Sequence, residues 1–489
     1  MSMEDGSCSS SQTLQRAGGS EECSTSGREY LAYFLHRHLD FRLPEIESLI
    51  ELAGQGKLTQ SRWRQPYGKH FYSPFWYLQL PSDAVAQEVA ARSILLKGFL
   101  DLWGEGETWE ELEASIRAFP EELKQPWLQP NLSMKVIVDG WGRVISLEEQ
   151  LKCHDRLEFI PFQNPVKLAD PDITFRLIIA NCYSNHGMPD TVPARMYFGR
   201  EVGHGNRRVL STYSLSKRVY LGPTSMDTEI AFIMCNQGKV RKGSFVFDPF
   251  AGTGSILVAA AHLGAVTLGA DIDIRVLRDG KTDSSGKVAD NWANFEDYGL
   301  PRPAGLIRAD AHRPPFRDDL HEILDAVVCD PPYGVRAGGR KSQSKPDLQV
   351  RDRTTHITST APYSMGECLR DLLDMSARLL RVGGRLVYFL PAAPEVYREE
   401  EVPRHPALRL VANSEQVLNA RYSRRLITMV KVHAYDRDAA AAFHAEQGDP
   451  RMAIDDIPAI VYEPRQYVDG KLVVSDKPPN RPKYRSKLC

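Results

Sequence analysis

The 489-residue sequence lacks the features that mark secreted, zinc-binding and membrane proteins. Its eight cysteines, scattered from Cys8 to Cys489, include no C-x-x-C pair, which suits a reducing compartment and argues against a zinc site in this chain. The N-terminus is polar and has no apolar segment of the kind found in secretory signals. The longest apolar stretch, residues 255–270, is interrupted by His262 and two glycines, so it predicts a buried helix and strand and no membrane span. We therefore expect a cytoplasmic protein without a bound metal and without membrane association.

The sequence also lacks a strong net charge. It has 61 Lys and Arg residues against 63 Asp and Glu residues, which gives a formal net charge of −2. Composition alone therefore indicates no nucleic-acid partner, and a surface that binds RNA has to be a local basic patch. Hydrophobic residues make up 42% and charged residues 25%, which is typical of a globular protein, and the length allows two or three domains.

Changes of pattern along the chain divide it into four segments. Residues 1–27 are rich in Ser, Gly and Glu and predict a disordered tail. Residues 28–212 predict an α+β domain, and residues 213–435 alternate between helix and strand, as in a Rossmann-like α/β fold with a parallel sheet. Residues 436–489 are polar and rich in proline and predict a flexible extension. In the second segment we expect strands at 30–35, 75–80, 134–138, 157–160 and 173–179 and helices at 43–54 and 84–103.

Acidic residues follow successive strands of the third segment. The strands expected there lie at 245–247, 266–270, 306–308, 326–329, 385–390 and 426–430. Asp248, Asp271, Asp310 and Asp330 come directly or almost directly after the first four. Because ligands bind at the carboxyl ends of the strands in doubly wound sheets, we expect these carboxylates to lie around one site.

The loop 248–254, Asp-Pro-Phe-Ala-Gly-Thr-Gly, predicts a cofactor site. Its glycines let a ligand approach the backbone, but it is neither a P-loop nor G-x-G-x-x-G, which disfavours a pyrophosphate. Asp271, with Asp273 beside it, is placed to bind a ribose diol, and Asp310 to accept from an adenine amino group. A ligand with a ribose and an adenine but no pyrophosphate fits S-adenosylmethionine. We assign its contacts to Thr224, Ser225, Asp248, Phe250, Gly252, Thr253, Gly254, Asp271, Asp273, Asp310 and Ala311.

The fourth acid opens the stretch Asp330-Pro331-Pro332-Tyr333, which we predict to be catalytic. The two prolines stiffen the turn, so that the carboxylate of Asp330 and the carbonyl of Pro331 can face one planar amino group. The ring of Tyr333 offers a face on which a heterocycle can stack. The alternative is an ordinary turn after a buried strand.

Two basic patches are candidates for RNA contact. Arg336, Arg340 and Lys341 follow the Asp330 motif, in a loop that we expect to contact phosphate groups beside the site. Arg421 and Arg424 form the second candidate patch. For both patches the alternative is a solvated surface that binds no RNA.

Taken together, these stretches resemble the eukaryotic tRNA (guanine-10-N2) methyltransferase catalytic subunit. The resemblance covers about residues 30–433, and its motifs are residues 33–45, 171–173, 197–201, 223–227, 248–254, 269–273 and 330–336. It implies an N-terminal THUMP-type tRNA-binding domain and a class I methyltransferase domain that methylates the exocyclic N2 of a guanosine. It also implies a heterodimer with a small zinc-binding activator subunit. In the family's sheet order the strand at 306–308 lies at an edge, where we expect the activator to pair.

Two other functions stay open on the motif residues alone. One is another amino-group methyltransferase, acting on adenine N6 or on a glutamine amide. The other is a non-catalytic RNA-binding protein that keeps a methyltransferase fold. The THUMP-like module favours structured tRNA over the first alternative, and the intact acids at the strand ends speak against the second.

Overall fold

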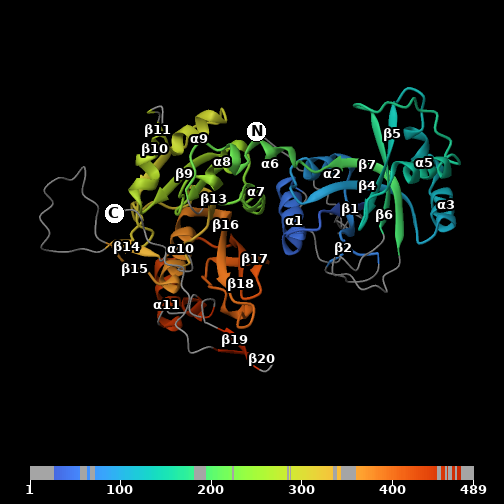
Figure 1. Ribbon diagram of the computed structural model, residues 1–489. Coiled ribbons are helices and arrows are strands. Elements are labelled where there is room, and N and C mark those ends of the chain that lie inside the picture. Colours follow the sequence, from blue (N-terminus) through green and yellow to red (C-terminus); the bar gives the residue numbers. More distant parts are fainter. Residues whose placement is uncertain are drawn as a thin grey trace, which may run out of the picture.

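The computed structural model describes residues 27–54, 63–66, 72–180, 194–222, 225–282, 286, 288–333, 339–342, 360–448, 453–457, 460, 465–468 and 471–474. In Figure 1 these residues form two domains, each built on a seven-stranded sheet, with α6 (Arg208–Thr212) in the connection between them. Except for Gly27, the expected disordered tail lies outside the described residues. None of the described helices is both long and apolar enough to cross a membrane.

The N-terminal domain is a mixed sheet with strand order β2-β3-β1-β4-β7-β6-β5, in which β5 and β6 run parallel and the other neighbours antiparallel. Its apolar residues form one cluster beneath α1 and α2 and another beneath α3 and α5. The predicted α+β domain is therefore confirmed. The strands are β1 (Arg28–Phe34), β2 (Trp63–Arg64), β3 (Phe75–Leu80), β4 (Leu96–Gly106), β5 (Met134–Trp141), β6 (Ile173–Ala180) and β7 (Arg195–His204). The helices are α1 (Arg42–Leu52), α2 (Asp83–Ala90), α3 (Trp109–Ala118), α4 (Glu121–Lys124) and α5 (Leu147–Arg156).

Two expectations for this domain were wrong. The single helix expected at 84–103 is α2 followed by β4, because a central strand buried on both faces is as continuously apolar as a buried helix. The strand expected at 157–160 is a turn after α5, in which the Ile160 amide donates to the Leu157 carbonyl at 3.0 Å. Leu157 and Ile160 are buried in the domain core, so their apolar character reflects packing and not strand pairing.

The C-terminal domain has strand order β12-β9-β8-β13-β16-β18-β17, with parallel pairs up to β16 and antiparallel pairs beyond it. Residues of α7, α8 and α9 pack in one core cluster and those of α10 in another, on opposite faces of the sheet. This confirms the predicted Rossmann-like fold and places the strand expected at 306–308 at an edge. The strands are β8 (Phe245–Asp248), β9 (Val266–Asp271), β12 (Gly305–Arg308), β13 (Leu324–Cys329), β16 (Leu380–Ala392), β17 (Leu408–Asn419) and β18 (Tyr422–Lys431). The helices are α7 (Thr228–Gln237), α8 (Ser255–His262), α9 (Asn291–Asp297), α10 (Met365–Leu379) and α11 (Arg437–Gln447).

The segment expected to be a flexible extension begins with a helix. Asp436 caps α11 by accepting from the Ala439 amide at 2.9 Å, and its alanine-rich sequence favours helix. His444 of α11 and His405 each lie within 3.7 Å of Asp374 on α10. The Nδ1 atom of His405 accepts from the Ala407 amide, so the neutral ring carries its proton on Nε2, facing Asp374. The contacts of Asp374 with the two histidines hold α11 against α10. Because the proton is on Nε2 of His405, this atom has no lone pair with which to bind a metal ion.

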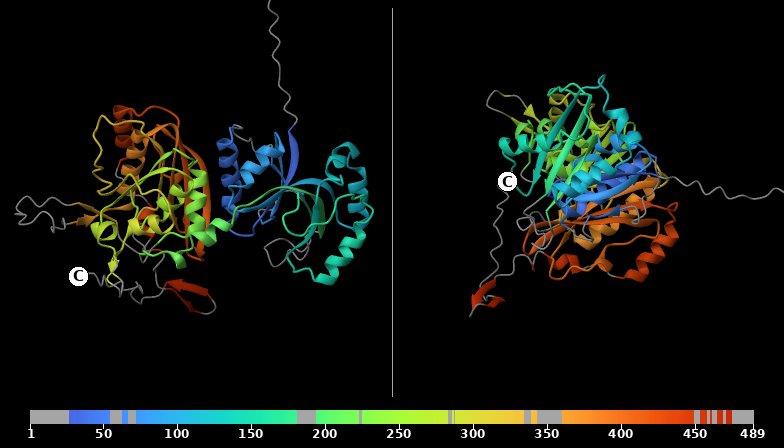
Figure 2. Two further views of the ribbon diagram at one scale, coloured as in Figure 1. Left: turned by 90° about the horizontal axis from the view of Figure 1, so that it is seen from above. Right: turned by 90° about the vertical axis from the view of Figure 1, so that its right-hand side faces the viewer.

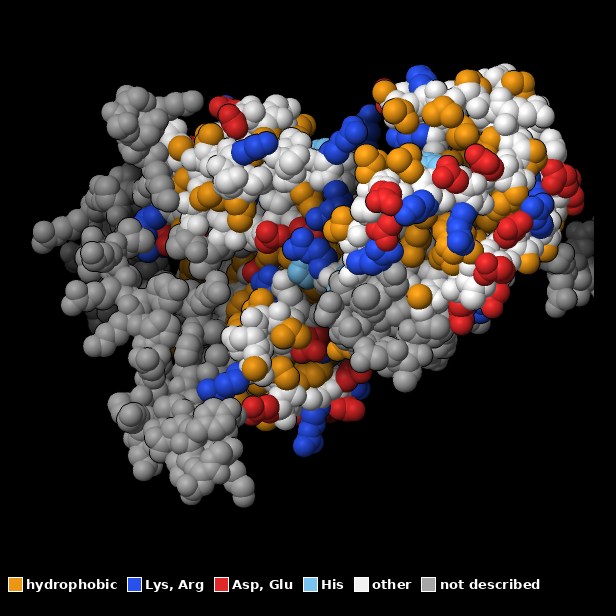
Figure 3. Space-filling view, turned by 45° about the vertical axis from the view of Figure 1, so that its right-hand side comes forward, with side chains coloured by type: hydrophobic (Ala, Val, Ile, Leu, Met, Phe, Trp, Pro, Cys, Tyr) orange, Lys and Arg blue, Asp and Glu red, His pale blue; other side chains and the backbone are white. Residues whose placement is uncertain are grey.

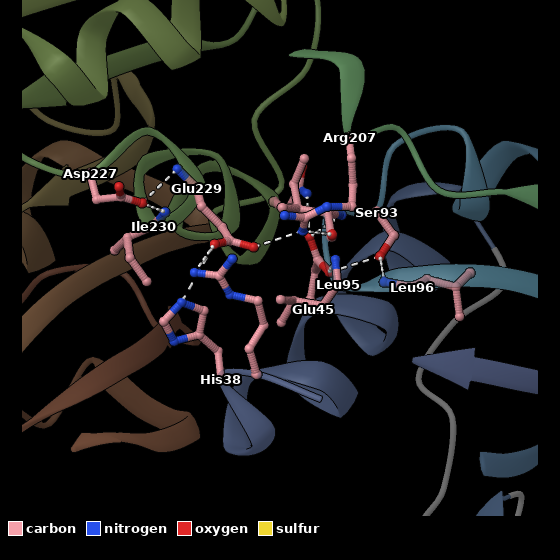
Figure 4. Close-up of polar contacts among 12 residues, drawn as sticks. His38, Glu45, Ser93, Leu95, Leu96, Arg207, Asp227, Glu229 and Ile230 are labelled. Atoms are coloured by element: carbon pink, nitrogen blue, oxygen red, sulfur yellow. Dashed lines mark hydrogen bonds and ion pairs between the residues drawn. The ribbon is translucent and has the colours of Figure 1, made fainter. Parts of the chain in front are cut away.

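A buried carboxylate joins the two domains. Figures 1 and 2 show α1 of the N-terminal domain against α7 of the C-terminal domain. Glu45 of α1 is fully buried and has four donors, which include partners from both domains (Figure 4). These donors are the Ser93 hydroxyl at 2.8 Å, the Ile94 amide at 2.9 Å, the Leu95 amide at 3.1 Å and the Asn236 side chain at 2.8 Å.

A second carboxylate, Glu229 near the start of α7, contacts two arginines and a histidine of the N-terminal domain. Arg37 lies at 2.9 Å, Arg207 at 2.8 Å and His38 at 3.7 Å from its oxygens (Figure 4). Apolar side chains from both domains also share one core cluster, to which the N-terminal domain contributes Phe41, Ile94 and Leu95. The two domains are therefore packed as one unit by buried polar and apolar contacts.

Candidate active site

A cavity of about 490 Å³ lies at the carboxyl ends of β8, β9, β12 and β13. The residues that line it are up to about 200 positions apart in the sequence. They meet because the parallel strands of this sheet present their carboxyl ends at one edge. The sequence-predicted residues that line the cavity are Ser225, Asp248, Phe250, Gly252, Thr253, Asp271, Ala311, Asp330, Pro331, Pro332, Tyr333, Arg340 and Arg424.

Other predicted residues do not line this cavity. Gly254, Asp273, Asp310, Lys341 and Arg421 lie outside its wall. Thr224 and Arg336 fall outside the described residues, so the structure does not place them.

The glycine loop between β8 and α8 leaves backbone open to the cavity. Gly252 has a φ of +51°, and a Cβ built there would meet no atom closer than the Phe250 carbonyl oxygen at 4.0 Å. Gly269 of β9 is needed for a different reason, since a Cβ there would lie 2.7 Å from the Leu257 side chain of α8. Absence of side chains at these positions both opens the loop and lets α8 sit close to the sheet.

Asp271 organises this loop from the end of β9. Its carboxylate accepts from the Gly252 amide at 3.0 Å and from the Asp273 amide at 2.9 Å. Burial raises its pKa, and these amide hydrogen bonds act in the opposite direction. A carboxylate has about four acceptor positions, so Asp271 keeps capacity for donors on a ligand. Asp273 is instead paired with Arg275 at 2.8 Å.

Asp310 does not line the cavity, and its contact with an adenine amino group stays a prediction. It is 8% exposed and accepts from the His312 amide at 3.0 Å and the Ser342 amide at 2.6 Å. The second bond ties β14 (Arg340–Ser342), which pairs with β15 (Thr360–Pro362), to the end of β12. The carboxylate thus holds the hairpin beside the cavity.

Asp330 directly follows β13 and lies at the cavity wall. Its Oδ2 lies 3.3 Å from Arg424 Nη1, and its Oδ1 is buried without a hydrogen-bond partner among the described residues. Burial raises the pKa of Asp330 to about 6, and Arg424 acts against that rise. An unsatisfied buried acceptor costs about 1–3 kcal/mol, which an N–H donor on a bound molecule would relieve.

The predicted basic residues prove to have different surroundings. Arg424 is only 14% exposed at its side chain and belongs to the cavity, not to a surface patch. Arg421 donates to the Ile460 carbonyl, and Lys341 pairs with Glu367 at 2.8 Å. Arg340 lines the cavity and donates to Thr360 at 2.8 Å.

The cavity also contains residues that sequence reasoning did not identify. They include Met226 before α7, Tyr363 before α10, and Leu418 and Tyr422 on the β17–β18 hairpin. Met226 sits next to Asp227, the N-cap of α7, within a stretch that the resemblance had marked. The sequence analysis did not predict β17 as a strand, so it did not identify this hairpin as part of the site.

Two family profiles match the chain. The profile described as Tmrp11 THUMP N-terminal domain matches residues 28–207, and that described as RMKL-like, methyltransferase domain matches residues 216–348. The tRNA (guanine(10)-N(2))-methyltransferase TRMT11 of Mus musculus is 38% identical over 83% of this chain and 89% of its own. The Homo sapiens protein of the same name is 37% identical with the same coverage of both chains. The solved structure of TrmN from Thermus thermophilus is similar with a TM-score of 0.39 and 16% identity, over 83% of this chain and 100% of that one.

Proposed function

Because the chain belongs to the TRMT11 family of tRNA (guanine(10)-N(2))-methyltransferases, we propose that it methylates the exocyclic N2 of a guanosine in tRNA with S-adenosylmethionine as methyl donor. The observation that carries this proposal is the Asp330-Pro331-Pro332-Tyr333 turn at the wall of the cavity. Its carboxylate has an unpaired buried oxygen, which suits the N–H donors of an amino group.

The cavity fits the proposed cofactor. The open face of Gly252 allows a ligand to lie against the backbone, and Asp271 keeps free acceptor positions for ribose hydroxyls. The loop residues Ser225 and Thr253, whose hydroxyls lie 2.9 Å apart, close the same end of the cavity. When bound, S-adenosylmethionine supplies an electrophilic methyl carbon, and its sulfur leaves with the bonding electron pair.

Asp330 and Pro331 prepare the amino group for transfer. The guanine amino nitrogen is a poor nucleophile because its lone pair is delocalised into the ring. Hydrogen bonds from its two N–H groups to the Asp330 carboxylate and the Pro331 carbonyl localise that pair and orient it. One N–H proton leaves after transfer, to Asp330 or to water. The base has to leave its stack to reach the cavity, and Tyr333 supplies a ring for stacking.

The N-terminal domain is proposed to bind the tRNA. A cavity of about 590 Å³ next to the connection between the domains includes Lys97, Arg176, Arg207 and Arg208 in its wall. Figure 3 shows Lys and Arg side chains gathered where the two domains meet. Arg176 is ion-paired with Asp139 and Glu201, and Arg207 with Glu229, so contact of this wall with phosphate groups would depend mainly on Lys97 and Arg208.

Nucleoside analysis tests the proposed function. Incubation of the full chain with tRNA and S-adenosylmethionine, alone and with the activator, is expected to yield N2-methylguanosine. Mass spectrometry of the digested tRNA identifies the product. Methyladenosine would favour the adenine N6 alternative, and absence of any methylated nucleoside under both conditions would overturn the proposal.

We further propose that a small zinc-binding activator pairs with the outer edge of β12, to which no other strand of the described residues is paired. An unpaired edge strand is a template for a strand of another chain. The Ala309 amide donates to the Asp271 carbonyl of β9 at 3.0 Å, so by strand alternation residues 305 and 307 face β9. Leu306 and Arg308 then present their N–H and C=O groups to the outer edge. Fixing this strand would also steady Asp310, which follows it.

Arg308→Pro is expected to abolish co-purification of the activator, because proline removes the outward N–H of β12 without removing a hydrogen bond to β9. Arg308→Ala keeps that N–H and is the matched control, for which binding is expected to persist. Circular dichroism checks that both variants stay folded. Retention of the activator by a folded Arg308→Pro chain would place the contact elsewhere.

A further inference from the structure

Arg424 is held from several sides at the back of the cavity. It lies on β18 directly opposite Gln416 of β17, whose side-chain oxygen accepts from Arg424 Nε at 2.6 Å. The guanidinium lies 3.8 Å from the centre of the Phe389 ring, and Met226 Sδ is 3.9 Å from Nη2. An arginine restrained in this way has lost most of its side-chain freedom before any substrate binds.

One nitrogen of this guanidinium reaches both ends of the catalytic turn. Arg424 Nη1 lies 3.3 Å from Asp330 Oδ2 and 3.2 Å from the Tyr333 hydroxyl. The carboxylate that is proposed to bind the amino group and the ring proposed to stack on the base therefore share one partner.

Asp330 lies in a part of the cavity that contains other carboxyl groups. Asp248, buried at the end of β8, interacts electrostatically with both Asp271 and Asp330, so three carboxyl groups surround the site. Burial, and also the negative charges of Asp271 and Asp330, raise the pKa of Asp248. Burial is what raises the pKa of Asp330, and Arg424 is the cation that the structure places against Asp330.

Resting on the proposed function, we propose that Arg424 is a positioning residue for amino-group methylation, which orients the Asp330 carboxylate and keeps it ionised. A protonated Asp330 has lost one acceptor oxygen and presents a hydroxyl to the amino group. Only the ionised form accepts from the N–H groups with full strength.

The sign of the pH dependence follows from the environment of Asp330. Its pKa is about 6, so the ionised fraction and the transfer rate are expected to rise as the pH rises through about 6. Removal of a contacting cation raises a carboxyl pKa by about one to three pH units. Arg424→Gln should therefore shift the acid limb of the pH–rate profile to higher pH by that amount.

The experiment compares methyl transfer by the full chain between pH 5 and pH 9 for wild type, Arg424→Gln and Arg424→Lys. For a shift of one to three pH units, Arg424→Gln is expected to lose between about twofold and about ninetyfold in rate at pH 7 and to regain part of that loss at pH 9. Arg424→Lys keeps the charge and should keep the acid limb near its wild-type position, with a lower maximal rate. Arg409→Gln removes an exposed arginine of β17 outside the cavity and serves as the charge control. An acid limb unmoved in Arg424→Gln would overturn the proposal.

A second measurement does not depend on activity. Proton titration of the wild-type chain minus that of Asp330→Asn gives the pKa of Asp330. The same subtraction between Arg424→Gln and the double variant gives the pKa of Asp330 without the arginine. A higher pKa in Arg424→Gln than in the wild-type chain supports the proposal, and equal values overturn it.

Should Arg424→Gln fail to fold, the same titration with Gln416→Ala, which removes the hydrogen bond to the guanidinium, is expected to give a smaller shift in the same direction. Failure of the wild-type chain to methylate tRNA would refute the proposed function. The titration would still decide whether Arg424 lowers the pKa of Asp330.

Discussion

Asp330→Asn is expected to lower the rate of methyl transfer by on the order of 10²–10³ while leaving the affinity for S-adenosylhomocysteine nearly unchanged. Asparagine keeps the size of the side chain but replaces one acceptor oxygen by an N–H₂ group, which opposes the amino group of the base. Asp330 lies at the end of the cavity assigned to the base, so the cofactor should not sense the change. Single-turnover transfer of a labelled methyl group and calorimetry with S-adenosylhomocysteine measure the two effects separately.

Asp271→Asn is the matched comparison, because it makes the same chemical change at the other end of the cavity. It is expected to weaken S-adenosylhomocysteine binding by roughly 1.5–3 kcal/mol, since a charged acceptor is lost and the Gly252 loop is loosened. Turnover like that of the wild type in Asp330→Asn would refute the mechanism. If Asp330→Asn weakened cofactor binding and Asp271→Asn did not, Asp330 would be assigned to the cofactor and Asp271 to the base.

Glu45→Ala is expected to lower the free energy of unfolding by about 3 kcal/mol or more. The substitution leaves two backbone amides and two side-chain donors without their acceptor, in a place that water does not reach. Because both domains contribute to this network and to one apolar cluster, they should lose stability together. Urea unfolding followed by fluorescence measures the change.

Glu88→Ala is the control for this experiment, since Glu88 is an exposed carboxylate on the neighbouring helix α2. It is expected to change the free energy of unfolding by less than about 0.5 kcal/mol. Two well-separated unfolding transitions in the wild-type chain, with Glu45→Ala affecting only the first, would contradict the joint packing of the domains.

Local sequence was sufficient for the parallel strands and the motifs of the C-terminal domain, although not for β17 or α11. The short apolar strands, the glycine loop and the Asp330 motif are recognisable because each depends on residues that are neighbours in the chain. The rule that parallel strands present their carboxyl ends at one edge then predicted that Asp248, Asp271 and Asp330 would meet. The same reasoning failed at 84–103, where a buried helix and a buried strand have the same apolar pattern.

Tertiary structure alone decided which way side chains point and which distant residues they meet. Arg424 is 94 residues from Asp330 in the chain, and the antiparallel register of β18 against β16, the neighbour of β13, brings it to the cavity. Asp310 follows its strand as predicted, yet its carboxylate accepts from two backbone amides and does not line the cavity. The contact between the domains includes the hydrogen bond that Asn236 donates to Glu45, although these residues are 191 positions apart in the chain. Strand ends are set by local pattern, whereas orientation and long-range pairing depend on packing that no single stretch of sequence contains.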